Sequence, residues 1–358
     1  MTKLNTIYKC LAAGCLALTA ALSGCDTIYE ESDCVSSYNL IHFKYDYNMK
    51  RADAFGSEVE RITMFLFDEE TGLLVRRVEV DKSELQNGQT LQLDIDPGEY
   101  DALVWAGYHE QSFDIDPGFV GVSGALDFHC RLKREEWSDG SAHVTSDLAP
   151  VFHGMKHLSL PYSSPSAPHT DSISLVKNTN VVRVVLQSLS GEQVNHEDFE
   201  FTITDGNGWL NHDNSLRDPA PITYHPWRTV TGIVDINTNP ADAPSGGAVP
   251  TTFPETASSR AVLGASLAEF TVNRLLDTNN PRLRVTNRRT GSTVLEVGVR
   301  DYALLVKGFY HEAMSDQEYL DRQDEYNMTF FIDENRSWIS NIIIINNWRI
   351  VRSNVGLH

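Results

Sequence analysis

The chain has 358 residues, of which 41% are hydrophobic and 22% are charged, with 23 Gly and 14 Pro. This composition is typical of a globular protein and excludes a disordered chain, a collagen and a coiled coil. The length suggests two domains, each large enough to bury its own core. The formal net charge of −20 argues against nucleic acid as a partner and against binding of anionic lipid headgroups by the folded surface.

The first 24 residues have the pattern of an export signal. Lys3 and Lys9 precede an uncharged apolar run at 10–22, which is too short to cross a bilayer but suits a signal peptide. The run ends in a lipobox, made up of Leu22, Ser23, Gly24 and Cys25. We expect residues 1–24 to be removed and the Cys25 thiol to carry diacylglycerol, so that acyl chains such as palmitate hold the protein on a membrane it does not span. The alternative is an ordinary secretory signal followed by an incidental cysteine.

Residues 25–35 would then form a lipidated tether. Four acidic residues lie in it, namely Asp26, Glu30, Glu31 and Asp33. In some diderm bacteria an acidic stretch behind the lipidated cysteine directs a lipoprotein to the cell surface. The alternative is a solvated tether whose charges carry no such signal.

Two further cysteines, Cys34 and Cys130, remain outside the signal and the lipobox. In an exported chain they can form one disulfide, and the alternative is two separate buried thiols. Two cysteines are too few for a cysteine-built metal site.

Segments in which apolar and polar residues alternate fill most of the remaining chain. Alternation with a period of two, rich in Val, Ile, Phe, Tyr and Thr, indicates half-buried strands, so the sequence predicts an all-β fold. The predicted strands include 40–47, 62–68, 74–80, 90–95, 100–107, 126–133, 172–177, 181–189, 199–205, 282–287, 293–299, 326–333 and 339–351. Short helices are expected only near 50–60 and 314–323.

The segment 91–105, LQLDIDPGEYDALVW, contains a strand, a Pro-Gly turn and a second strand. Pro97 at the second and Gly98 at the third turn position predict a type II turn. The pattern is similar to one in the transthyretin-like and pre-albumin-like sandwiches of secreted bacterial proteins. A second DIDPG at 114–118 lacks a preceding alternation and is interpreted as a loop turn.

A proline- and serine-rich linker at 161–170, PYSSPSAPHT, cannot continue a central strand. It divides the chain into an N-terminal domain, 36–165, and a C-terminal domain, 166–358. A second stretch of similar composition, 239–259, predicts a long exposed loop.

Several segments together resemble one family, the FimB/Mfa-type fimbrial anchor lipoproteins. They are FKYDYNMKRADAF (43–55), VERITMFLFDEETGLLV (59–75), the Pro-Gly strand at 97–100, DSISLVKNTNVVRVVL (171–186) and the tail 319–351. The resemblance covers nearly all of the chain behind the signal and includes the lipobox.

This resemblance implies two tandem transthyretin-like β-sandwich domains. It also implies a lipid-anchored minor fimbrial subunit at the base of a surface-exposed fimbrium. Such a subunit tethers a shaft pilin, or another fimbrial subunit, to the outer membrane and can limit fibre length. Because fibres of this family polymerise by strand exchange, and exposed sheet edges can accept a further strand, the apolar strands 40–47 and 339–351 are candidates to flank the docking groove. The alternative for 339–351 is a central core strand.

No motif of an enzyme is found, so no catalytic residue, cofactor or metal is expected. His153 and His157 fall in a predicted strand, where they would lie about 13 Å apart, too far to share one ion. Asp205 and Asn207 begin like a calcium loop, but Trp209 stands where an oxygen ligand belongs, so a Gly-rich hairpin turn is preferred. The carboxylates around the Pro-Gly turn, Asp94, Asp96 and Asp101, are expected to be solvated.

A second hypothesis is a cell-surface lipoprotein that binds glycans or a host surface through exposed aromatic side chains. Trp137, Trp209 and Trp227 fall in loop-like segments and could stack on sugar, or could be partly buried under loops. Trp105 and Trp348 lie in predicted strands and are expected in the core.

Overall fold

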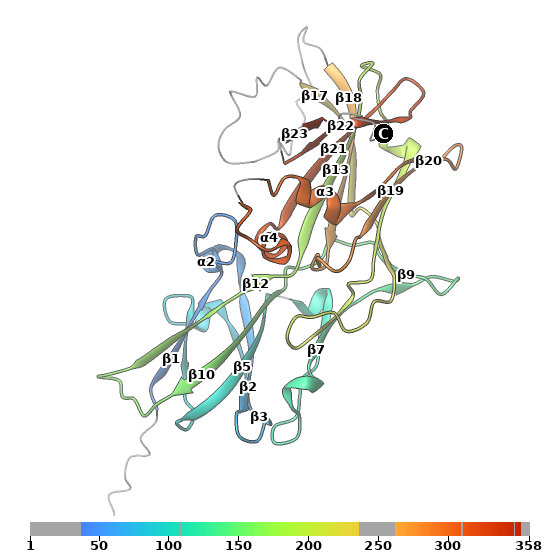
Figure 1. Ribbon diagram of the computed structural model, residues 1–358. Helices are drawn as coiled ribbons and strands as arrows, with labels where there is room; N and C mark the ends of the chain where they lie inside the picture. Colours follow the sequence, from blue (N-terminus) through green and yellow to red (C-terminus); the bar gives the residue numbers. More distant parts are fainter. Residues whose placement is uncertain (1–36, 108, 236–261, 309–310, 347, 352–358) are drawn as a thin grey trace, which may run out of the picture.

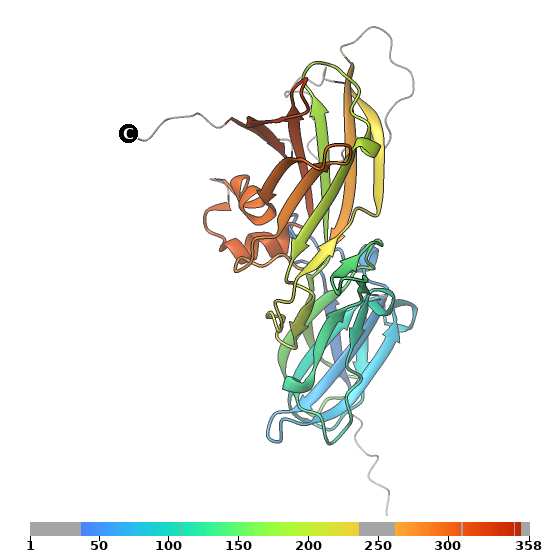
Figure 2. The ribbon, with the colours of Figure 1, turned by 90° about the vertical axis from the view of Figure 1, so that its right-hand side faces the viewer.

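The computed structural model describes residues 37–351 apart from 108, 236–261, 309–310 and 347. Two β-sandwiches lie end to end along the molecule, the N-terminal one low and the C-terminal one high in Figures 1 and 2. The fold is all-β with two tandem transthyretin-like sandwiches, as the sequence predicts.

The N-terminal sandwich begins with an outer sheet of three strands packed on a central sheet of five. The outer sheet contains, in spatial order, β11 (His169–Ser174), β1 (Asn39–Lys44) and β4 (Thr90–Leu93). The central sheet contains β12 (Val176–Lys177), β10 (Phe152–Leu160), β5 (Gly98–Ala106), β2 (Arg61–Asp68) and β3 (Leu74–Asp81). Ile41 and Phe43 of β1 are fully buried in the same cluster as Met64 of β2 and Val104 of β5, so the alternating apolar face of β1 closes this core.

The middle of the central sheet is buried on both faces, which explains the unbroken apolar run of β2. Six consecutive residues of that strand, 62–67, are buried. Their second face is covered by a lateral sheet of three strands, β15 (Trp209–Asn211), β7 (His129–Leu132) and β6 (Phe113–Ile115). Phe65 of β2 meets Phe128 there, with ring centroids 4.6 Å apart. A strand covered on both sides needs apolar side chains in both directions.

The C-terminal sandwich consists of two sheets of six strands. The first has the order β17 (Arg228–Asp235), β18 (Val262–Val272), β13 (Asn180–Ser188), β21 (Glu325–Ile332), β22 (Trp338–Ile345) and β23 (Trp348–Val351). The second has the order β20 (Thr293–Gly298), β19 (Arg282–Asn287), β14 (Phe199–Asp205), β16 (Ile222–Tyr224), β9 (Ala142–Val144) and β8 (Glu135–Glu136). Val184 of β13 and Phe201 of β14 belong to the core between them.

Strands from both sides of residue 165 share sheets. β11 and β12 pair with β1 and β10 of the N-terminal sandwich, and β15 pairs with β7. In the other direction β9 pairs in parallel with β16, which brings β8 and β9 into the C-terminal sandwich. The sheets therefore do not divide at 165, and one continuous core contains both Trp105 and Val184.

The Pro-Gly turn at 97–98 differs from the type II prediction. Gly98 does not have a positive φ and is the first residue of β5. Its missing side chain makes room for Tyr100, because a Cβ at Gly98 would lie 3.3 Å from the phenol ring. The Tyr100 hydroxyl in turn donates to the Asp96 carbonyl at 2.8 Å. Gly118 in the second DIDPG is the glycine with a positive φ, +64°.

Helices are short in the described part of the chain. α2 (Phe55–Glu58) and α4 (Asp316–Arg322) lie within the two regions where the sequence predicts helix, and Ser315 caps α4 by accepting from the Glu318 N–H at 3.0 Å. α3 (Val299–Leu305) was not predicted. Single 3₁₀ turns occur at η1 (Lys82–Glu84), η2 (His109–Gln111), η3 (Ala125–Asp127) and η4 (His196–Asp198).

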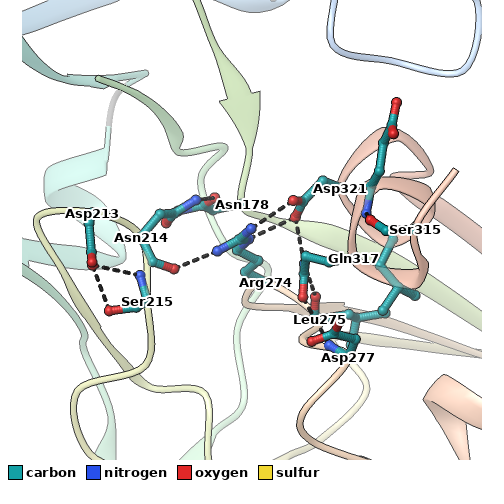
Figure 3. Close-up of polar contacts among 12 residues, drawn as sticks. Asn178, Asp213, Asn214, Ser215, Arg274, Leu275, Asp277, Ser315, Gln317 and Asp321 are labelled. Carbon is teal, nitrogen blue, oxygen red and sulfur yellow. Dashed lines mark hydrogen bonds and ion pairs between the residues drawn. The ribbon is translucent and has the colours of Figure 1, made fainter. Parts of the chain in front are cut away.

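Arg274 lies at the centre of a polar junction between the two sandwiches (Figure 3). Its guanidinium binds the Asp321 carboxylate of α4 through two hydrogen bonds of 2.7 Å, with only 12% and 8% of the two side chains exposed. It also donates to the carbonyl of Asn214. The Asn214 amide exchanges hydrogen bonds of 2.7 and 2.9 Å with Asn178, which directly follows β12. The chain leaving the N-terminal sandwich is thereby linked to α4.

A second junction joins loops of the N-terminal sandwich to the residues around the end of α4. Lys177 donates to Glu58 at 2.8 Å and to Asp324 at 3.2 Å. The Arg322 guanidinium lies 4.0 Å from the centre of the Tyr47 ring. Charge pairs and a cation–π contact therefore hold the two sandwiches at several points.

We predict that Asp321→Asn lowers the free energy of unfolding by about 3–5 kcal/mol, because it leaves the buried Arg274 charge without its partner. Denaturant unfolding measures the change. The matched control is Asp316→Asn in the same helix, which removes the half-exposed partner of Lys307 and should cost about 1 kcal/mol or less. Equal losses in the two variants would contradict a stabilising role for this junction.

Candidate functional site

The predicted site of lipid attachment, Cys25, and its lipobox residues Leu22, Ser23 and Gly24 lie outside the described residues, as does the tether 25–35. The described chain enters the fold at Ser37, and the Tyr38 N–H donates to the Ser163 carbonyl at 3.3 Å. Among the residues that the structure describes, no helix combines the length and apolarity needed to cross a bilayer.

Cys130 lies in β7 and is 1% exposed as a free thiol. Burial raises the pKa of this thiol, and the nearby carboxylates of Asp114 and Asp116 raise it further, which favours the protonated form. Its predicted partner Cys34 lies outside the described residues, and the disulfide stays a prediction.

The two strands predicted to flank a docking groove differ in their position. β1 lies between β11 and β4, so both of its edges are paired. The segment 339–351 is not one strand, because Asn346 adopts a φ of +45° at a turn that separates β22 from β23. β22 is internal, with Ile343 and Ile345 fully buried, whereas β23 is the last strand of its sheet. β23 therefore has one unpaired edge among the described residues.

The predicted aromatic platforms do not form one cluster. Trp105 is fully buried, as expected for the core, whereas the side chain of Trp348 lies outside the described part. The Trp209 ring is covered, with the guanidinium groups of Arg131 and Arg217 each 5.1 Å from its centroid. Trp137 and Trp227 remain open to solvent, at 45% and 38% exposure.

Trp137 is part of a stack with two imidazoles that the sequence did not predict. It lies in the β8–β9 turn, 3.5 Å from the centre of the His143 ring and 5.2 Å from that of His225. The two imidazoles are joined from His143 Nδ1 to His225 Nε2 at 2.9 Å. Burial, and then His143, lower the pKa of His225. His143 and His225 are 82 positions apart in the sequence, so no local spacing could have revealed the stack.

A cleft of about 400 Å³ adjoins this stack, and His225 belongs to both. The residues that line it include Phe199 and Phe201, which are largely buried, and the charged residues Glu200 and Arg288. An exposed indole beside a polar cleft is a chemically suitable surface for a sugar ring, because the indole contacts C–H groups and the charged groups bind hydroxyls.

The polar residues considered for metal binding do not converge. The buried His153 donates from Nε2 to the His212 carbonyl at 2.7 Å, and burial lowers the pKa of His153 to about 4. His157 is exposed between Asp101 and Glu99, where the bond to Asp101 raises its pKa. Within the described residues no group of three His, Cys, Asp or Glu side chains could hold a metal ion.

Asp205 and Asn207 form a buried turn instead of a calcium loop. The Asn207 amide donates to the carbonyl of Asn273 at 2.9 Å, and its oxygen accepts from Tyr224 at 2.6 Å. Burial raises the pKa of Asp205 to about 6. The side chain of Asn207 is thus engaged in joining β14 to the end of β18 and to β16.

Similarities to known proteins agree with this architecture. A crystal structure from Bacteroides thetaiotaomicron, provisionally described as an adhesin, is 28% identical with a TM-score of 0.74, over 88% of this chain and 98% of that one. A second from the same organism, provisionally described as polysaccharide-binding, is 26% identical with a TM-score of 0.71, over 89% and 99%. The fimbrial anchor protein Mfa2 from Porphyromonas gingivalis shares the fold, with a TM-score of 0.62 and 16% identity over 88% and 99%.

A comparison with curated proteins finds no match. A family model, that of the fimbrillin-A associated anchor proteins Mfa1 and Mfa2, matches residues 29–354. The match begins four residues after Cys25 and runs through both sandwiches to the residues that follow β23. The resemblance seen in the sequence is thereby confirmed, and the chain belongs to the family of fimbrillin-A associated anchor proteins Mfa1 and Mfa2.

Proposed function

We propose that this protein is a lipid-anchored minor fimbrial subunit that tethers a pilus shaft to the outer membrane. The observation that carries the proposal is the position of the family match, which starts directly behind a lipobox and covers both sandwiches. Acyl chains on Cys25 would supply the membrane attachment, since the folded surface is strongly acidic. The two sandwiches would act as a structural link without enzymatic activity or a cofactor.

The first pilin would dock by strand exchange at an edge of a sandwich. An unpaired edge offers backbone N–H and C=O groups in a row, which a partner's strand can complete. β23 has such an edge and follows an inner strand, β22, that ends in four isoleucines. Because one end of the subunit would be occupied by lipid and the other by a single pilin, the subunit would start a fibre without extending it, which would limit fibre length.

The anchoring step is tested by Cys25→Ala in cells that make fimbriae. We expect the variant to leave the membrane fraction and the fibres to be shed into the medium, because the acyl chains have no other attachment point. Cell fractionation with immunoblotting and a count of released fibres measure both effects. Cys34→Ala, nine residues further along, is the matched control and should stay membrane-bound. A Cys25→Ala protein that remains as firmly attached as wild type would refute lipid anchoring.

The docking edge is tested by two truncations. A protein lacking residues 350–358 loses half of β23, whereas one lacking 352–358 keeps the strand whole. We expect the first to lose co-purification with the shaft pilin and the second to retain it. If both capture the pilin equally well, this end of the chain is not the docking element.

A second candidate function, glycan binding, is favoured by the half-exposed Trp137 beside the cleft at His225. The relative provisionally described as polysaccharide-binding is consistent with it. We expect wild-type protein to be retarded in a polysaccharide-containing affinity gel and Trp137→Ala to migrate freely, because the platform is lost. Trp227→Ala removes an indole of similar exposure that is not part of the stack with His143 and His225, and it should leave the retardation unchanged. Identical migration of all three proteins with and without polysaccharide would exclude this function.

A further inference from the structure

Large apolar and aromatic side chains that are strongly exposed gather at one end of the molecule. Among the described residues five such side chains are more than 60% exposed: Phe119, Val120, Val122, Leu126 and Tyr162. The first four come from one loop of eight residues, 119–126, which we call the apolar loop. Soluble monomers seldom expose apolar side chains in such a contiguous group, and a group of this kind marks a contact surface.

The strand register places the apolar loop at the end of the sandwich where the chain enters. The Tyr38 N–H bonds to the Ser163 carbonyl, close behind the end of β10. The last residue of β10 pairs with the first of β5, and the start of β5 pairs with the end of β2. The apolar loop is attached to the start of β3, which follows β2 after a short turn. Figures 1 and 2 both show the start of β1 and this loop at the same, lower end.

Backbone hydrogen bonds hold the apolar loop in one conformation. The Leu74 N–H donates to the Ser123 carbonyl, and the Gly121 N–H donates back to the Leu74 carbonyl, both at 2.7 Å. Gly118, with a φ of +64°, lies where a Cβ would come within 2.2 Å of the Phe128 ring. The ends of the loop are thus fixed against the core while its apolar side chains are exposed to solvent. Held in this way, the loop cannot turn these side chains into the core.

The number of residues between Cys25 and the first described strand limits how far this end of the sandwich can lie from a lipid on Cys25. Thirteen residue steps separate Cys25 from Tyr38 and span at most about 45 Å. A lipid on Cys25 would therefore keep the end that carries Tyr162 and the apolar loop close to the bilayer. The opposite end, with β23, belongs to the C-terminal sandwich.

We propose that the apolar loop, together with Tyr162, inserts into the interfacial region of the membrane that holds the lipid anchor. This inference rests on the proposed anchoring at Cys25. The loop side chains Phe119, Val120, Val122 and Leu126 would enter the boundary between headgroups and acyl chains, and the phenol of Tyr162 suits the headgroup level. The exposed carboxylates of Glu69 and Glu70 at the neighbouring β2–β3 turn disfavour anionic headgroups, so attraction to the membrane would be apolar and favour neutral lipid.

The insertion would add a second contact to the acyl chains. One lipid group fixes only a point, which by itself does not set the orientation of the body. A rigid apolar contact on the sandwich itself would set that orientation, with the N-terminal sandwich on the membrane and the C-terminal sandwich away from it.

The test uses the full-length acylated protein in phosphatidylcholine vesicles whose acyl chains carry bromine, a quencher of tryptophan fluorescence at close range. Two variants are compared with wild type, Phe119→Trp in the apolar loop and Leu189→Trp in the C-terminal sandwich, where the leucine is 48% exposed. We expect the emission that Phe119→Trp adds to wild type to fall about twofold or more on brominated lipid, because interfacial segments enter the bilayer by about 5–10 Å. The emission that Leu189→Trp adds should not change.

Three outcomes would overturn the inference. If both variants float with the vesicles and neither is quenched, the anchor holds but the loop does not touch the bilayer. If the added emission of Phe119→Trp shifts only when purified shaft pilin is present, the loop is a protein-docking surface. If the acylated protein does not float with vesicles, the proposed anchoring fails and the insertion fails with it.

Discussion

The central constraint in this structure is that the middle strands of the five-stranded central sheet, β5 and β2, are covered on both faces. Their second face is closed by β6 and β7 from the N-terminal half and by β15 from the C-terminal half. The same exchange in the opposite direction carries β8 and β9 to β16. Neither sandwich can complete its core without strands from the other half of the chain, and one hydrophobic core therefore continues between them.

For a subunit that links a membrane to a fibre, as proposed above, this interlocking would determine how a load passes through the molecule. Two domains joined by a single linker would bend at that linker. Here a load applied to the C-terminal sandwich is transmitted to the N-terminal one through paired strands, through Arg274 and Asp321, and through the contacts of Lys177. The polar junctions lie on α4 and directly behind it, at Asp321, Arg322 and Asp324.

The sequence allowed much of the fold to be predicted, because alternating apolar residues are a direct consequence of strands with one buried face. The run ITMFLF of β2 lacks alternation, and the structure shows why: both of its faces are buried. β18 escaped prediction because Gly264, Ala265, Ser266 and Ala268 have low strand propensity. Small residues are needed there, since a Cβ at Gly264 would lie 2.4 Å from the Glu192 carbonyl.

The Pro-Gly turn was misjudged because the sequence gives no sign that Gly98 makes room for Tyr100. The stack of Trp137, His143 and His225 depends on a long-range strand pairing, which no local pattern encodes.

The position of β1 also has a consequence for the order of events during export. β1 is the first strand of the chain, yet one of its two neighbours is β11, with Asn39 opposite His169 in parallel register. A chain threaded across a membrane from its N-terminus presents β1 long before β11 arrives. The N-terminal sandwich therefore cannot close until about half of the polypeptide has been translocated, and pairings between such distant segments form slowly. During that interval the alternating face of β1, with Ile41 and Phe43, is uncovered.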